Sequence, residues 1–170
     1  YSVNPDAEVY VKVTNSWYDP KAEEEASRKL LDMNCDVIAQ HCDTVYPQTL
    51  AQQKGVYSIG YNSDMSKEAP EACLCSVIWN WSAYYTSAVQ SVIDGTWDGS
   101  NYYGGMNENL VSITPIADFA AAATKEKVGV FDGVIETNTG AEVGTAGKTL
   151  EDSVITGGIN WYFKTVKVIE

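Results

Sequence analysis

Apolar and polar residues alternate at the start of the chain in a pattern typical of a strand that runs into a helix. Val11 and Val13 alternate with polar neighbours, and this period of two predicts a strand over residues 9–14. Asp19 suits a helix N-cap and Pro20 the first helical position, where no backbone donor is needed. The helix predicted over residues 20–33 has an apolar stripe at i, i+4, i+8 and i+11, formed by Ala22, Ala26, Leu30 and Met33.

The same alternation of strands and helices continues to about residue 94. Apolar runs of strand length occupy residues 36–40, 56–60 and 73–78. Helical segments at 46–54 and 82–94 follow, each closed by a glycine. This order predicts an α/β fold: a parallel sheet flanked by helices on both faces, with the carboxyl ends of the strands on one edge.

The last third of the sequence has a different pattern. Residues 101–115 read as extended chain with a turn at Gly104-Gly105, and residues 130–143 predict a hairpin around Asn138-Thr-Gly140. Between them, residues 120–128 begin like a helix but stop after about two turns at a glycine.

Polar and aromatic residues gather in the loops that follow the predicted strands. Ligands of open α/β sheets bind outside the carboxyl ends of the strands, so these loops predict a small-molecule site. The candidate ligand-binding residues are Asn15, Trp17, His41, Asp64, Trp79 and Asn80.

The side chains in this set suit a flat, polar-edged ligand. Trp17 or Trp79 would stack on a heteroaromatic ring, while Asp64 would accept hydrogen bonds from ribose hydroxyls or ring N–H groups. Asn15 offers both a donor and an acceptor to a purine edge. The competing interpretation is structural, because tryptophans also fill cores and Asp and Asn also form turns.

His41, Cys42 and Asp43 are consecutive and invite a catalytic interpretation, since Cys and His can form a thiolate pair. Adjacent residues on an extended chain point to opposite sides, so His41 is poorly placed to activate Cys42. No glycine-rich oxyanion loop accompanies them. We therefore expect no catalytic residues, and interpret His41 as a hydrogen-bond partner in the wall of a cleft or as a structural histidine.

Composition excludes some classes of partner. The chain has 170 residues, with 11 basic and 23 acidic side chains and a net charge of -12. Nucleic acid requires a basic surface, and anionic lipid also attracts basic segments, so neither is expected as a direct partner. No apolar run is long enough to span a membrane. No signal peptide is present, and the abrupt start at Tyr1 leaves room for an export signal upstream.

The four cysteines do not match a metal signature. Cys73 and Cys75 have the wrong spacing for a zinc knuckle, the chain has one histidine, and we expect no metal or other cofactor. Cys35 and Cys42 flank a strand that would hold them about 20 Å apart, too far for a disulfide. Free thiols are favoured, with Cys73 and Cys75 on the same face of a strand, although pairing across strands stays open.

Stretches along nearly the whole chain resemble the basic membrane protein family of ABC-transporter substrate-binding lipoproteins. That family has the type I periplasmic-binding-protein fold, which the resemblance implies here as one lobe plus a partial second lobe. The matching stretches, in order, are Ser2-Val-Asn-Pro-Asp-Ala7, Thr14-Asn-Ser-Trp-Tyr-Asp-Pro20, Asp36-Val-Ile-Ala-Gln-His41, Gly55-Val-Tyr57, Gly60-Tyr-Asn-Ser-Asp-Met65, Ser76-Val-Ile-Trp-Asn-Trp81, Asp94-Gly-Thr-Trp97, Tyr103-Gly-Gly-Met106, Val130-Phe-Asp-Gly-Val-Ile135 and Gly147-Lys-Thr-Leu150.

The resemblance implies a substrate-binding component of an ABC importer without enzymatic activity. Members capture a purine nucleobase or nucleoside between two lobes by hinge closure and deliver it to an ABC permease. An extracytoplasmic location, in the periplasm or at the cell surface, is implied, with a lipid anchor that is absent from this chain. The rival interpretations are a nucleoside-processing enzyme and a one-lobe sensor or structural module.

Two departures from the family stand out. The chain resembles mainly the second half of the family, so we expect it to lack segments at its start and near residue 128. We expect residues 1–80 to form the ligand-binding lobe, 81–102 a helix crossing to the other lobe, and 103–170 the return strands and closing hairpin. Trp79-Asn80-Trp81 stands where nucleoside-binding members have a lysine-containing loop, so ribose recognition through that lysine is not implied.

Overall fold

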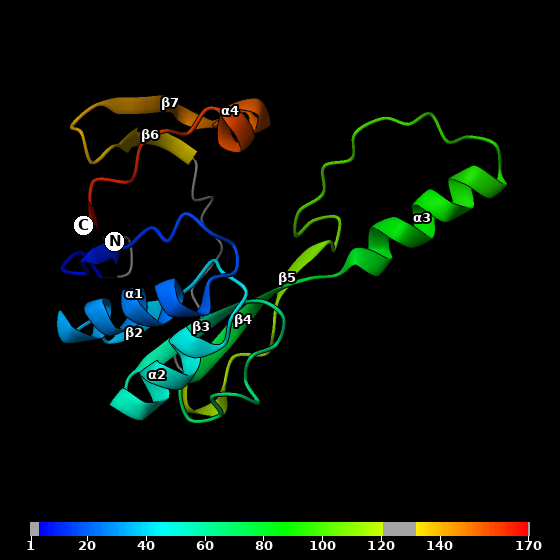
Figure 1. Cartoon of the computed structure of the whole chain (residues 1–170). Coiled ribbons are helices and arrows are strands. Elements are labelled where there is room, and N and C mark those ends of the chain that lie inside the picture. Colours follow the sequence, from blue (N-terminus) through cyan, green and yellow to red (C-terminus); the bar gives the residue numbers. More distant parts are fainter. Residues whose placement is uncertain (1–3, 121–131, 170) are drawn as a thin grey trace. The chain divides into compact units, whose positions relative to one another are not determined.

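The computed structural model describes residues 4–120 and 132–169 and shows two compact units (Figure 1). One unit comprises residues 14–122, and the other comprises residues 1–13 with 123–170. The short helical segment predicted at 120–128 lies almost wholly outside the described residues, as do the first two residues of the predicted hairpin.

The unit of residues 14–122 contains a four-stranded sheet in the order β2-β3-β4-β5. Strands β2 (Val37–Ala39), β3 (Tyr57–Asn62) and β4 (Cys73–Trp79) are parallel, as predicted, and β5 (Val111–Ile113) is antiparallel to β4. A short 3₁₀ helix, η1 (Asp118–Ala120), follows β5. The carboxyl ends of the three parallel strands therefore share one edge of the sheet.

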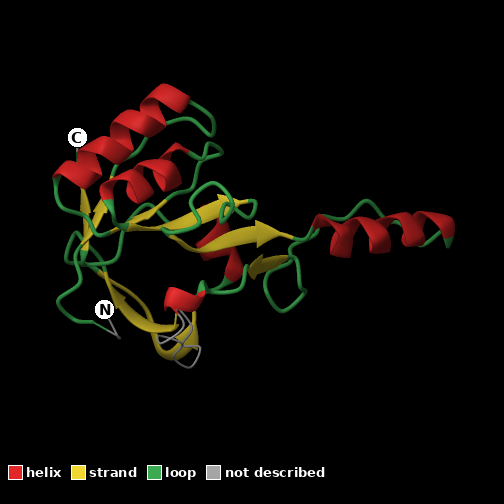
Figure 2. Ribbon diagram, turned by 90° about the horizontal axis from the view of Figure 1, so that it is seen from below, coloured by secondary structure: helices red, strands yellow, loops and turns green. Residues whose placement is uncertain are grey.

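Helices α1 (Pro20–Asp32) and α2 (Tyr46–Lys54) lie on the same side of this sheet (Figure 2). The predicted start of α1 is confirmed, because the Asp19 carboxylate accepts a hydrogen bond from the Ala22 N–H at 3.0 Å. Gly55 ends α2 with a φ of 75°, in the left-handed region that glycine adopts without steric cost.

The cores of this unit lie on the helix side of the sheet and beside β4. Leu31 of α1 and Leu50 of α2 pack with Ile38 of β2. A second cluster is made by Met65, Ala69, Ala72 and Cys73. The neighbours of Ile38 in β2 point to the opposite face and are exposed, Val37 by 39%. The predicted α/β class, with parallel strands flanked by helices, is confirmed, although at β2 the helices of the described residues cover one face alone.

A β-bulge in β4 changes the direction of its side chains. Cys73 pairs with Ser58 of β3, whereas Cys75 pairs with the next residue, Ile59. Because neighbouring strands alternate in step, Cys73 and Cys75 face opposite sides of the sheet, contrary to the sequence prediction. All four cysteines are free thiols, with Cys73 buried and the others half-buried.

Helix α3 (Trp81–Ile93) forms at the predicted position but buries none of its residues. Figures 1 and 2 both show it extending away from the sheet of its own unit. Its exposed apolar side chains include Val89, Val92 and Ile93. An apolar helix with no buried residue is unusual, because most helix stability in proteins comes from packing.

The described residues of the unit formed by 1–13 and 123–170 make two small sheets. Strand β1 (Val9–Val11) pairs in parallel with β8 (Val166–Val168). Our prediction that this strand belongs to the same sheet as β2, β3 and β4 is therefore wrong. Strands β6 (Asp132–Glu136) and β7 (Glu142–Thr149) form the predicted antiparallel hairpin, and α4 (Asp152–Gly157) follows. The hairpin turn closes through a 2.8 Å hydrogen bond from the Thr137 N–H to the Ala141 carbonyl.

Candidate ligand-binding site

Aromatic rings meet at the carboxyl ends of the parallel strands. The ring of Trp17 lies 5.4 Å from that of His41, and the His41 ring lies 4.3 Å from that of Tyr61, both in edge-to-face arrangements. The Tyr61 ring lies 6.4 Å from that of Trp79, again edge to face. The structure thus brings together three predicted site residues, although the sequence places them far apart.

The series of ring contacts continues into α3. The indole of Trp79 stacks on that of Trp81 at 5.7 Å, and Trp81 stacks on Tyr85 at 5.9 Å. We call this continuous set the ring row; it consists of Trp17, His41, Tyr61, Trp79, Trp81 and Tyr85. Its end at Trp17 is 63% exposed. An exposed indole presents a free face on which a flat ligand can stack.

Hydrogen bonds hold the loops of the ring row against one another. The Asp43 N–H donates to the Trp17 carbonyl at 2.9 Å. The Cys42 thiol contacts the Thr14 hydroxyl at 3.5 Å and donates to the Ser16 carbonyl. On the other side, the Asn62 amide donates to the Asp43 carboxylate at 3.3 Å. The loops after β2 and β3 and the loop before α1 are therefore tied together.

Asn15 and Asp64 lie in loops at the same edge but have turn geometry. Asn15 has a φ of 55°, a left-handed conformation that asparagine tolerates better than most residues. The Asp64 carboxylate accepts a 3.0 Å hydrogen bond from the Ser66 N–H, and this bond lowers the pKa of the carboxyl below its ordinary value. Both side chains are exposed, and among the described contacts none joins either of them to the ring row.

Asn80 uses its polar groups at the junction between β4 and α3. Its backbone N–H donates to the Leu110 carbonyl at 2.7 Å, and its amide donates to the Asn109 carbonyl at 3.2 Å. Its side-chain oxygen accepts a 2.6 Å hydrogen bond from the Ser82 hydroxyl. These bonds fix Trp79 and Trp81 on either side of it.

The sequence interpretation missed Tyr61, which links His41 to Trp79, and Tyr85, which extends the ring row. A signal for Tyr61 was present, because this residue directly precedes the polar loop of Asn62 at the end of β3. Tyr85 carried no comparable signal, since its place in the ring row depends on the direction in which α3 leaves the sheet.

The residues at the ring row do not form a nucleophile–base pair. The Cys42 thiol bonds toward Thr14 and Ser16, while the His41 ring packs between Trp17 and Tyr61. Within the described part of the chain, no group of three or more His, Cys, Asp or Glu side chains could hold a metal ion.

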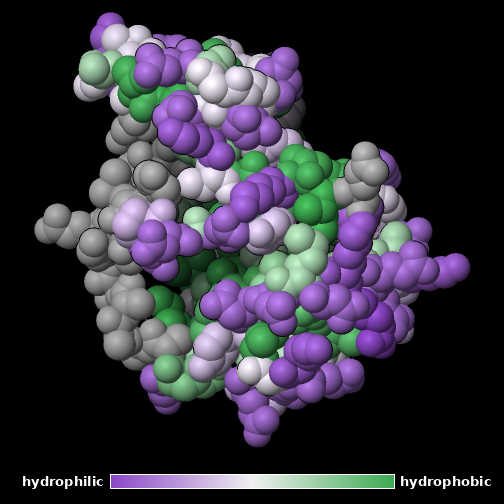
Figure 3. Space-filling view, turned by 90° about the vertical axis from the view of Figure 1, so that its left-hand side faces the viewer, coloured by the Kyte–Doolittle hydropathy of each residue, from purple (hydrophilic) through white to green (hydrophobic). Residues whose placement is uncertain are grey.

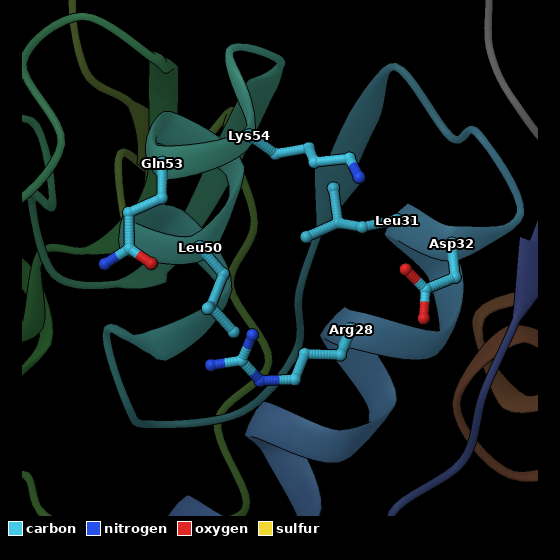
Figure 4. A pocket seen from close by; sticks show the side chains of 6 residues that line it. All are labelled: Arg28, Leu31, Asp32, Leu50, Gln53 and Lys54. Atoms are coloured by element: carbon cyan, nitrogen blue, oxygen red, sulfur yellow. The ribbon is translucent and has the colours of Figure 1, made fainter.

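A cavity of about 280 Å³ lies elsewhere, between α1 and α2 (Figure 4). Figure 4 shows the side chains of both helices around it; the lining residues are Arg28, Leu31, Asp32, Leu50, Gln53 and Lys54. These residues belong to the later turns of α1 and α2, which lead back to the amino-terminal edge of the sheet. Because α/β sheets bind ligands at the opposite edge, the ring row, and not this cavity, is the candidate ligand-binding site. Figure 3 shows hydrophilic side chains over much of the visible described surface, with apolar patches between them.

Comparison with known proteins agrees with the fold and with the resemblance seen in the sequence. The profile of a family described as ABC transporter substrate-binding protein, PnrA-like (Bmp), matches residues 1–138. The chain belongs to this family. The basic membrane protein resemblance is thereby confirmed.

Two curated relatives are similar over much of this family member. A purine-binding protein of Brucella abortus is 36% identical over 172 residues, which cover 95% of this chain and 49% of the relative. A putative ABC transporter glucose-binding protein of Haloferax volcanii is 34% identical over 75% of this chain and 32% of its own length. The chain therefore spans half or less of the relatives it matches.

A solved structure has the same fold. An ABC transporter solute-binding protein of Conexibacter woesei aligns with a TM-score of 0.51 and 22% identity, covering 68% of this chain and 39% of that protein. Among the helices of the described residues, none is sufficiently long and apolar to traverse a bilayer.

Proposed function

We propose that this family member captures a purine nucleobase or nucleoside at the ring row, as the ligand-binding part of an ABC importer. The observation that carries the proposal is the placement of Trp17, His41 and Trp79 in one set of ring contacts at the carboxyl edge of a parallel sheet. This edge is where α/β folds bind small ligands. The relative from Brucella that is named a purine-binding protein supports the same ligand class.

The proposed contacts combine stacking with hydrogen bonds at the ligand edge. Trp17 or Trp79 stacks on the heterocycle, and His41 lines the wall between them. Asp64 and Asn15 bond the polar edge, where the Asp64 carboxylate accepts hydrogen bonds and the Asn15 amide can both donate and accept. Asn80 holds Trp79 in place through its bonds to Asn109 and Ser82.

In the complete protein, the proposed mechanism is closure of two lobes on the ligand. A ligand that contacts both lobes stabilises the closed state, which a permease can distinguish from the open one. This role places the protein outside the cytoplasmic membrane, attached by a lipid anchor, with an ABC permease as its partner. No enzymatic step, cofactor or nucleic acid belongs to this proposal.

Calorimetric titration tests the proposal directly. We would titrate the unsubstituted protein with adenine, adenosine, guanosine and glucose. Trp97→Ala serves as the control for loss of an indole. Trp97 lies after α3 and has no contact with the ring row among the described side chains. We expect saturable binding of at least one purine by the parent protein and by Trp97→Ala.

Other outcomes point to the rival functions. Binding of glucose without binding of any purine would favour a glucose-binding protein, as the Haloferax relative is named. Chemical conversion of a nucleoside, followed by chromatography, would favour an enzyme. Purine binding by a stable one-lobe monomer with no closure would favour a sensor.

A further inference from the structure

Glu23 is a buried carboxylate that the proposed ligand contacts do not use. It lies in the first turn of α1 and is 2% exposed, although it has no salt-bridge partner among the described residues. Buried carboxylates are costly unless hydrogen bonds compensate for lost water. Such a residue in a small domain calls for a specific reason.

Three donors surround the two carboxylate oxygens of Glu23. Oε1 accepts from the Asp19 N–H at 3.1 Å. Oε2 accepts from the Thr44 N–H at 3.1 Å and from the Thr44 hydroxyl at 2.6 Å. Every neighbour donates, so the acceptor-only carboxylate matches the site and a neutral amide does not.

The two oxygens bond to different loops. The bond to Asp19 resembles a local helix cap, in which an acidic side chain in the first turn returns to the N-cap N–H. The bonds to Thr44 reach a residue 21 positions away, in the loop between β2 and α2. A cap of α1 alone would not require this second connection.

These loops carry the first two members of the ring row. Trp17 lies two residues before Asp19, and His41 lies three residues before Thr44. The loops also meet through the 2.9 Å hydrogen bond from the Asp43 N–H to the Trp17 carbonyl. A rigid connection at Glu23 therefore fixes the distance between the indole and the imidazole.

We propose that Glu23 is a positioning residue of the ligand site, whose two carboxylate oxygens set the relative placement of Trp17 and His41. The consequence for purine capture rests on the proposed function, whereas the placement itself is independent of any ligand. Preorganised contacts bind more tightly because less ordering remains to be done on binding.

The test uses Glu23→Gln, which preserves shape and removes one acceptor. An amide keeps one oxygen and puts an NH₂ donor where the other oxygen accepted, so it can serve Asp19 or Thr44 but not both. Glu25→Gln is the matched control, because Glu25 lies in the same helix and is 69% exposed. Thr44→Val is a second variant that removes the hydroxyl donor and leaves Glu23 unchanged.

The readout is the imidazole signal of His41 in the proton NMR spectrum without ligand. The chain has a single histidine, so this signal needs no further assignment. Its ring protons feel the ring currents of Trp17 and Tyr61, which lie 5.4 and 4.3 Å away between ring centroids. A loss of stability in a protein that remains folded would not move this signal; a change in loop placement would.

We expect Glu23→Gln and Thr44→Val to move the His41 signal toward that of an unfolded chain, while Glu25→Gln leaves it in place. We expect the purine affinity of Glu23→Gln to fall about tenfold, because side chains that are no longer held in place must be ordered on binding. An unchanged His41 signal in both Glu23→Gln and Thr44→Val overturns the inference, whatever happens to purine binding. A moved signal in a protein that binds no purine supports the inference and overturns the proposed ligand.

Discussion

Single residues of the ring row make the most direct predictions. Replacing Trp17 or Trp79 by alanine should weaken purine binding by about 1–3 kcal/mol, the cost of removing an aromatic platform under a base. Trp97→Ala should bind as the parent does. Calorimetry on the three variants measures this, and a loss confined to Trp97→Ala would contradict the assignment of the site.

Asp64 makes a separate prediction, because its turn geometry offers a competing explanation. If the carboxylate bonds the ligand, Asp64→Ala should cost about 1–3 kcal/mol by leaving buried ligand donors unpaired. The loss should differ between adenine and guanosine, whose polar edges differ. If Asp64 serves only the turn closed by the Ser66 N–H, Asp64→Ala should lower the thermal unfolding temperature. Its affinity for each ligand should then equal that of the unsubstituted protein.

Trp17 reaches the edge of the sheet through the hydrogen bond from the Asp43 N–H to its carbonyl, and not through β1, which pairs with β8. The sequence was sufficient to place His41 and Trp79 at this edge, because parallel strands bring their following loops together. It was insufficient for Tyr61 and Tyr85. A tyrosine at the end of a strand can point to either face, and only the path of α3 brings Tyr85 onto Trp81. Contacts between rings depend on side-chain direction, which residue spacing does not fix.

At the scale of elements, the side chains of Ser76 on β4 and of Met65 fill the space beside Gly60 on β3. A Cβ added to Gly60 would lie 2.4 Å from the Ser76 Oγ and 3.1 Å from the Met65 Cβ. The same Ser76 hydroxyl accepts a 3.1 Å hydrogen bond from the Met65 N–H, so moving it breaks that bond. Gly60→Ala should therefore destabilise the fold by about 1–3 kcal/mol through overpacking.

Chemical denaturation measures this cost, with Gly157→Ala in α4 as the control. A Cβ at Gly157 meets no atom within 4 Å, so this change should alter the free energy of unfolding by no more than about 0.5–1 kcal/mol. Equal effects of the two substitutions would show that the close approach at Gly60 is relieved without strain.

The elements themselves show where patterns in the sequence suffice. The start of α1 and the end of α2 were predictable, since Asp19, Pro20 and Gly55 act locally. The pairing of β1 was not, because its alternation suits any sheet and its partner, β8, lies more than 150 residues later. The bulge in β4 was also hidden, since an extra residue leaves no mark in an apolar run.

At the scale of the molecule, the exposure of α3 and the length of the relatives lead to one prediction. The chain covers 49% of the Brucella relative, and α3 buries no residue. If the rest of that relative's length also contributes ligand contacts, this chain on its own should bind purines at least about a hundredfold more weakly than the relative does. Parallel titrations of the two proteins measure the difference, and equal affinities would contradict this prediction.

Because of the bulge in β4, Cys73 and Cys75 differ in exposure, and their reactivities can be compared to detect local unfolding of this strand. Cys75 is half-buried and Cys73 lies on the buried face, two positions away on the same strand. Burial raises the pKa of the Cys75 thiol, so its alkylation should be slow but should proceed in the native state. Alkylation of Cys73 must wait for local unfolding of the strand. The ratio of the two labelling rates, measured by mass spectrometry, therefore reports how often β4 unfolds locally beside the ring row.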